Sequence, residues 1–169
     1  LGDTEQLYAA LMGLHTFYQV RGSLRMAVSL GEKLVAIAEE RDERLWRAQS
    51  HRCLGWSLFC NGQLASGAEH LSIALALFDR LQSQAHVRTL GAHPWVVGFV
   101  NAALLEWFAG HPETAIERSR EALELARELQ SPLPLAYALC MSAKVHCLRH
   151  EPEIALALAS EGVELAVKH

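Results

Sequence analysis

A pattern that recurs every forty residues constrains the fold of this chain more than any other feature of its sequence. The segments AGHPETAIERSREALELA (109–126) and RHEPEIALALASEGVELA (149–166) align with a proline and an alanine in register. Residues 20–38 and 60–78 share the same frame and are also forty apart. Repeats of this length are typical of stacked helical units, because one unit cannot bury its apolar face alone. The marker positions are Gly22, Gly62, Gly110 and His150, with eight extra residues between the second and the third.

Each unit is predicted to be a pair of antiparallel helices. Residues 44–60 carry apolar side chains at three- and four-residue spacing, Gly62 interrupts this spacing, and it resumes afterwards. Pro112 and Pro152 suit the first turn of a second helix, where the missing N–H has no intrahelical partner. The sequence therefore predicts an all-α fold, an α-α superhelix (solenoid) of about four helical hairpins. We expect a single repeat domain over residues 1–169, with units at about 5–43, 44–82, 92–130 and 131–169.

One position of the repeat, five residues after the marker, is always small. A large side chain there would push apart two helices that otherwise pack about 8–10 Å axis to axis. We therefore expect the helices of each hairpin to approach one another most closely at this position. It is occupied by Ala27, Gly67, Ala115 and Ala155.

Composition and charge argue against several classes of partner. The formal net charge of −4 lacks the basic footprint that nucleic-acid binding requires. The most apolar stretch, residues 95–110, is interrupted by polar residues and is too short to span a bilayer. The cysteines form two pairs seven residues apart, about 10.5 Å along a helix, which is too far for a disulfide. Free thiols are typical of cytoplasmic proteins. Because the chain begins with Leu1, we expect it to be a fragment of a larger protein.

The repeat resembles the tetratricopeptide repeat (TPR). The matching residues are Leu54–Gly55, Gly62, Leu64 and Ala74–Leu75 in the second unit, and Gly110, Ala115 and Ala122–Leu123 in the third. The first unit departs from the family pattern at Gly31, where an aromatic residue is usual, and the fourth at His150. The forty-residue period resembles the long repeats that follow the ATPase module of large bacterial signalling proteins. These include fusions with adenylate or guanylate cyclases and ATP-dependent transcriptional activators, and residues 14–43 carry most of this likeness.

The TPR resemblance implies a concave groove lined by the first helix of each unit. The predicted groove residues are Gln49, Arg52, Trp56 and Phe59, then Val100, Leu104 and Trp107, then Tyr137 and Lys144, with Met12, Thr16, Gln19, Cys140 and Cys147 at further family positions. This surface is apolar in its middle, so an apolar helix or extended peptide suits it better than a charged tail. Alternatively, Trp56 and Trp107 pack in the core, since burial is the usual fate of a large apolar group.

No motif in the sequence indicates catalysis. There is no phosphate-binding loop, nucleophile elbow or H-E-x-x-H zinc helix, so we predict neither enzymatic activity nor a cofactor. His146, Cys147 and His150 crowd together as metal ligands do, and the two histidines are four residues apart. However, the repeat frame places His150 at a helix end, where the helix dipole favours histidine without a metal. We therefore interpret this cluster as a turn.

Glu106 and His146 occupy the same repeat position, where the family has a large apolar residue. A half-buried carboxylate needs a partner. We expect Glu106 and His146 to face one another between adjacent helices as a buried pair, the alternative being that Glu106 reaches solvent or Arg118.

Two functions agree with these features. The first is a non-catalytic interaction module of a multidomain signalling or regulatory protein, monomeric or homodimeric, which binds a protein or a segment of its parent chain. The second is an inducer-sensing domain that binds a small molecule on its concave face.

Overall fold

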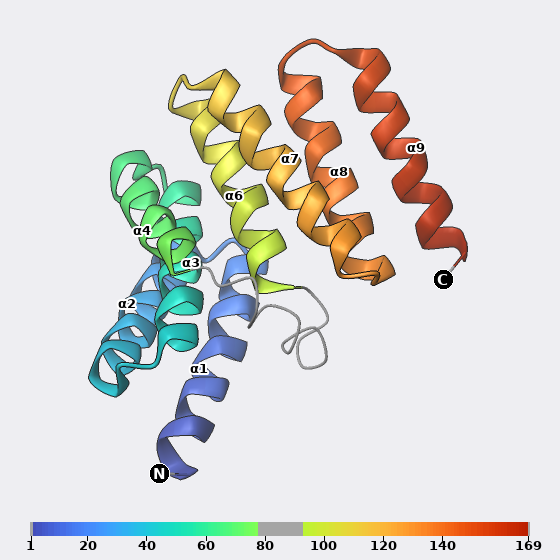
Figure 1. Cartoon of the computed structure of the whole chain (residues 1–169). Coiled ribbons are helices and arrows are strands. Elements are labelled where there is room, and N and C mark those ends of the chain that lie inside the picture. The colour runs from blue at the N-terminus through green and yellow to red at the C-terminus, as the bar shows by residue number, and fades with distance from the viewer. Residues whose placement is uncertain (1, 78–92, 169) are drawn as a thin grey trace. The chain divides into compact units, whose positions relative to one another are not determined.

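The computed structural model describes residues 2–77 and 93–168, and every regular element in these ranges is an α-helix. The chain divides into two compact units, residues 1–77 and 78–169. In the first unit the helices are α1 (Gly2–Val20), α2 (Leu24–Arg41), α3 (Arg44–Cys60) and α4 (Leu64–Ala76). In the second they are α6 (Pro94–Phe108), α7 (Pro112–Glu128), α8 (Pro132–Leu148) and α9 (Pro152–Lys168) (Figure 1). The all-α prediction is confirmed. That the four hairpins form one domain stays a prediction.

In the first unit each helix packs on the next one along the chain. Glycine allows two close approaches between them. A Cβ atom at Gly55 of α3 would lie 2.9 Å from the carbonyl oxygen of Gly67 in α4. A Cβ at Gly31 of α2 would lie 3.1 Å from the Cα of Leu54. The absence of an aromatic residue at Gly31, a departure from the TPR pattern, is therefore what allows α2 to lie against α3.

The second unit also places sequential helices side by side, and α6 contacts α8 as well. Prolines begin all four of its helices, as the missing N–H allows. Between α7 and α8 the buried Ser119 Oγ donates a hydrogen bond of 2.8 Å to Ser142 Oγ, so two polar side chains satisfy one another inside the helix interface. In Figure 1, α9 lies beyond α8 at the outer end of this unit.

The small position of the repeat is buried in all four hairpins, as predicted. Its residues are Ala27, Gly67, Ala115 and Ala155. In the second hairpin the close approach at Gly67 is the contact with Gly55 described above.

The four marker residues all adopt the left-handed conformation that ends a helix. Their φ angles are +75° at Gly22, +86° at Gly62, +86° at Gly110 and +61° at His150. In each turn the N–H after the marker donates to a carbonyl five residues earlier, at 2.9–3.0 Å. This bond and a second one from the marker N–H define the Schellman motif. The interpretation of His150 as a turn residue is therefore confirmed.

In the predicted second unit α4 ends at Ala76, and residues 78–82 of that unit lie outside the described residues. The inserted segment 81–94 also lies outside them up to residue 92. Among the residues that the structure describes, no helix is long and apolar enough to cross a membrane.

Candidate functional site

In the first unit the predicted groove residues differ in exposure. Gln49 of α3 is buried, so it offers little surface to a partner. Arg52, Trp56 and Phe59 are partly exposed along the same helix. The rings of Trp56 and Phe59 lie 5.1 Å apart between centroids, which makes them one aromatic surface rather than two separate ones.

A polar network that the sequence did not reveal joins α1 to α3 beneath this surface. The buried His15 forms a hydrogen bond of 2.9 Å from Nε2 to Ser57 Oγ, and Ser57 Oγ donates to Gln19 Oε1 at 2.7 Å. Burial and, secondarily, the charge of Arg52 lower the pKa of His15 to about 4. The imidazole is therefore neutral at pH 7. Gln19, a predicted groove residue, thus serves to hold the two helices together.

A second link between the same helices is aromatic. Tyr8 of α1 stacks on Trp46 of α3 with 4.0 Å between ring centroids. The Tyr8 hydroxyl donates to the Trp46 carbonyl at 3.1 Å and lies 2.9 Å from Ser50 Oγ. Burial raises the pKa of Tyr8, so its hydroxyl stays protonated. Tyr8–Ser50 and His15–Ser57 are each separated by forty-two residues, close to the repeat period, which is the signal that would have identified them.

Arg52 lies among these groups without a counter-ion. Its Nη2 contacts Cys53 Sγ at 3.3 Å, and its buried Nε has no hydrogen-bond partner. Among the described residues it forms no ion pair with a carboxylate. An unpaired guanidinium favours an acidic or carbonyl group in whatever occupies this face.

In the second unit the predicted groove residues separate by helix. Val100 and Leu104 of α6 are buried, and Trp107 is partly exposed. The α8 residues form a more open strip at helical spacing, in which Tyr137 is partly exposed and Lys144 is exposed. Cys140 and Cys147 are exposed in the same strip. The open part of the predicted groove in this unit thus comes from α8 and Trp107.

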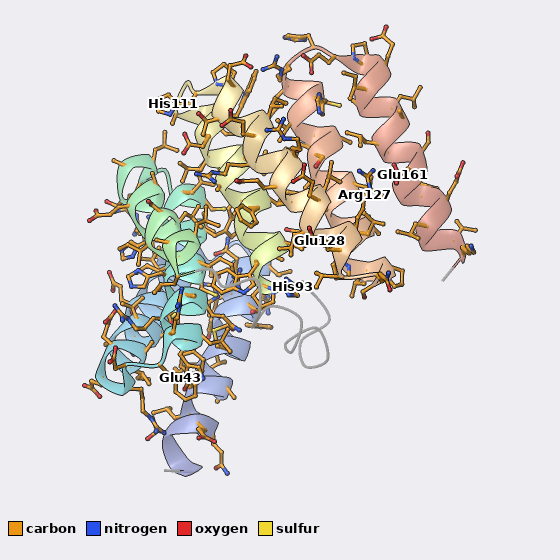
Figure 2. All side chains as sticks on the ribbon, viewed as in Figure 1. Glu43, His93, His111, Arg127, Glu128 and Glu161 are labelled. Carbon is orange, nitrogen blue, oxygen red and sulfur yellow. The ribbon has the colours of Figure 1, made fainter. Side chains whose placement is uncertain are left out.

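Glu106 and His146 each pair within their own turn rather than with one another. His111 Nδ1 donates to Glu106 Oε2 at 2.8 Å, and His146 Nδ1 donates to Glu151 Oε2 at 2.6 Å. Figure 2 shows His111 at the turn between α6 and α7. The Schellman motif explains this pairing, because it brings together the side chains of the residues that its long hydrogen bond joins. Those residues are five apart, so the partner comes from the same turn and not from the next repeat.

The metal alternative for the cluster at residues 146–150 has no support in this geometry. His146 Nδ1 is engaged by Glu151, and His150 lies in the turn. Within residues 2–77 and 93–168, no group of three or more His, Cys, Asp or Glu side chains is placed to hold a metal ion.

The outer face of α9 is an exposed apolar surface that the sequence did not identify. It consists of Leu156, Ala159, Val163, Ala166 and Val167, all exposed. Leu156, Val163 and Val167 are 69%, 63% and 83% exposed. Another side of the helix faces its own unit, where Ala155 and Gly162 are buried, Gly162 lies against Leu139 of α8, and Glu161 pairs with Arg127 of α7 at 3.5 Å (Figure 2).

The repeat frame shows what this face corresponds to. Forty residues earlier, in α7, the equivalents of Ala159 and Ala166 are Ser119 and Ala126, which are only 3% and 0% exposed. Ser119 is the residue that bonds to Ser142 of α8. These two positions of the α9 face therefore correspond to positions of α7 that pack against α8, whereas the α7 equivalent of Val167 is the exposed Arg127.

Comparisons with known proteins support the fold. No family model matches the sequence, and no curated protein matches it either. Among solved structures, BtubC (BKLC) from P. vanneervenii superposes with a TM-score of 0.72 at 15% identity, covering 98% of this chain and 65% of that one. A Podosopora anserina putative kinesin light chain with nearly identical TPR-like repeats gives 0.67 at 19% identity, covering 95% and 74%. MamA gives 0.60 at 15% identity, covering 95% and 79%. At these identities the likeness concerns the fold alone, and that fold is an all-α, TPR-like helical repeat of the solenoid class.

Proposed function

We propose that this chain is a non-catalytic interaction module, and that the outer face of α9 holds a helix from a partner protein or from elsewhere in its parent chain. The observation that carries this proposal is the contrast between two equivalent faces. In α7 the two small positions of the face, Ser119 and Ala126, are buried, and in α9 all five residues of the face are apolar and exposed. Exposed apolar surface of this kind marks interaction sites in soluble proteins. TPR-like repeats, the fold found here, are typically scaffolds rather than enzymes.

The packing of α8 on α7 supports a helix as the occupant of the α9 face. An amphipathic helix would lie along Leu156, Val163 and Val167, whose spacing of seven and four follows one side of a helix. The alanines at 159 and 166 leave room for a close helix crossing, as Ser119 and Ala126 do in α7. An extended peptide would leave its backbone polar groups unpaired on this apolar face, so a helix fits better.

The wider setting follows from the sequence resemblance. The likeness of residues 14–43 to repeats of bacterial signalling ATPases supports a role in receiving or passing on a regulatory input. The four thiols are free, which supports a cytoplasmic location. An inducer-sensing role for the concave side is the second candidate, and the partly exposed Trp56 and Phe59 beside the unpaired Arg52 favour it.

The test uses a synthetic peptide of residues 132–148, the α8 sequence, with Cys140→Ser and Cys147→Ser and a fluorescent label. We expect saturable binding to the whole chain by fluorescence anisotropy, with a gain of helical circular dichroism. Val163→Glu should weaken binding at least tenfold, because it places a charge in the middle of the apolar face. Ala157→Glu makes the same charge change at another exposed position of α9, outside this face, and should leave binding unchanged.

Two results would overturn the proposal. One is equal peptide binding by the Val163→Glu and Ala157→Glu variants. The other is a concentration-dependent dimer, measured by light scattering, that Val163→Glu converts to a monomer. That second result would assign the face to another copy of this chain rather than to a partner helix.

A further inference from the structure

Three helices of the first unit bring two histidines and a carboxylate into one hydrogen-bonded row. His51 of α3 lies with its Nδ1 2.8 Å from Nδ1 of His70 in α4. Its other nitrogen, Nε2, lies 3.3 Å from Oε1 of Glu39 in α2. His51 is only 6% exposed, so both nitrogens must find their partners inside the protein.

The carboxylate at one end determines where the protons of this row lie. The hydrogen bond from His51, assisted by Arg47, holds the pKa of Glu39 below its usual value, so Glu39 is an acceptor only. With one proton on its ring, His51 donates from Nε2 to Glu39 and accepts at Nδ1. His70 must then donate from its Nδ1, which leaves its Nε2 with an unshared electron pair.

The free nitrogen of His70 belongs to a groove. Its Nε2 forms no hydrogen bond with any residue in 2–77 or 93–168 and is not a buried atom. His70 lines an open groove of about 420 Å³ together with Glu32 of α2 and the apolar side chains Val35, Leu54 and Leu58. Glu32 is exposed and forms no ion pair among the described residues. Gln63 and Ser66 complete the lining. The groove thus offers the acceptors of His70 and Glu32, with two further polar side chains, beside an apolar wall.

We propose that this groove binds a primary ammonium group carried on an aliphatic chain. The ammonium group has three donors and no acceptor, so it can donate to both His70 Nε2 and the Glu32 carboxylate. The aliphatic chain would lie on Val35, Leu54 and Leu58. An anion is disfavoured by Glu32, and a divalent metal would find only two ligands here. A free alkylamine and a lysine side chain share this chemistry.

Acid should release the ligand, because a proton competes with it for His70 Nε2. Burial and the neighbouring His51 lower the pKa of His70 below 6.5, although the carboxylates of Glu69 on α4 and Glu32 on α2 act in the opposite direction. With Glu39 and Arg47 at the far end of the row, these are the charged groups around the two imidazoles. We therefore expect full binding at pH 7–8 and its loss as the pH falls through this lowered pKa.

The experiment titrates the ¹⁵N-labelled whole chain with n-hexylamine, observing the imidazole and backbone signals by NMR. We expect saturable shifts at His70 and along α2 and α4, with hexan-1-ol binding at least tenfold more weakly because it lacks the charge. Nα-acetyl-lysine methylamide in place of hexylamine distinguishes the two sources of the ammonium group. If it binds at least as tightly as hexylamine, a partner's lysine is the ligand, and otherwise a free amine is.

Two variants complete the test. Glu32→Gln, an exposed change that should not disturb folding, should weaken hexylamine binding at least tenfold, whereas Glu69→Gln, outside the groove, should weaken it less than threefold. Val163→Glu should leave hexylamine binding unchanged, because it alters the α9 face and not this groove. Equal binding of hexylamine and hexan-1-ol, unchanged binding by Glu32→Gln, or the absence of any saturable shift at His70 would overturn the proposal.

Discussion

The hairpins α6–α7 and α8–α9 form the same backbone turn with different side chains. In both, the N–H after the marker residue bonds to a carbonyl five residues earlier, and a histidine and a glutamate pair across the turn. The two residues have exchanged places, as Glu106–His111 in one turn and His146–Glu151 in the other. The marker itself changes from Gly110 to His150. The repeat therefore preserves the backbone geometry of the turn and the two positions that pair across it, while the residue types at those positions vary.

The same two hairpins differ in what covers their second helix. Ser119 and Ala126 of α7 are buried against α8, whereas their equivalents in α9, Ala159 and Ala166, are exposed. With Leu156, Val163 and Val167 they form an exposed apolar face, so the same repeat positions have a structural role in α7 and the proposed binding role in α9.

The largest expected effect tests this difference in cover. Ala126→Glu in α7 would bury a carboxylate at a position that is 0% exposed, and we expect it to lower the free energy of unfolding by about 3–5 kcal/mol. Ala166→Glu, the same change forty residues later on the exposed face, should change that free energy by less than about 0.5 kcal/mol. Urea unfolding followed by circular dichroism measures both. Similar losses in the two variants would show that the α9 face is covered in the isolated chain.

The next effect concerns the marker residue. His150 is held at a φ of +61°, where side chains other than glycine are strained, so His150→Gly should raise the free energy of unfolding by about 1 kcal/mol. Gly110→His should lower it by about 1–2 kcal/mol, and by more than His150→Gly gains, because a φ of +86° lies outside the small left-handed region that other residues tolerate. The same unfolding experiment measures both changes. If His150→Gly destabilises the chain, the imidazole contributes more at this turn than its backbone strain costs.

The sequence predicted the features of the fold that leave a visible mark on residue type. A left-handed turn favours glycine and a close helix crossing requires a small side chain, so the marker and small positions could be found by comparing repeats. Side-chain contacts between helices leave no such mark on residue type. The link from His15 to Ser57 has only its separation of forty-two residues, close to the repeat period, as a signal, and the pair of His51 and His70 needed the structure.

The candidate surfaces were harder to predict than the fold. The family pattern identifies which helix lines a groove, but it does not specify how much of each side chain stays exposed. Val100 and Leu104 occupy groove positions and are nevertheless buried. The repeat position that Glu106 shares with His146 predicts a partner in the next repeat. The turn motif, which joins residues five apart, would have identified His111 instead.

The smallest effect tests the charge pair of the last turn. The hydrogen bond from His146 and, secondarily, that from Arg149 hold the pKa of Glu151 below its usual 4.5. We expect His146→Gln to raise this pKa more than Arg149→Gln does, as measured by NMR titration of the side-chain carboxyl carbon. A carboxyl group whose pKa is lowered by folding stabilises the protein above its unfolded-state pKa, and this contribution is lost as the pH falls through the folded-state value. The stability difference between the native chain and Glu151→Gln should therefore be present at pH 7 and vanish at strongly acidic pH. If Arg149→Gln has the larger effect on the pKa, then the neighbouring arginine rather than the exchanged histidine holds the carboxylate, and the likeness to the Glu106–His111 turn is one of position only.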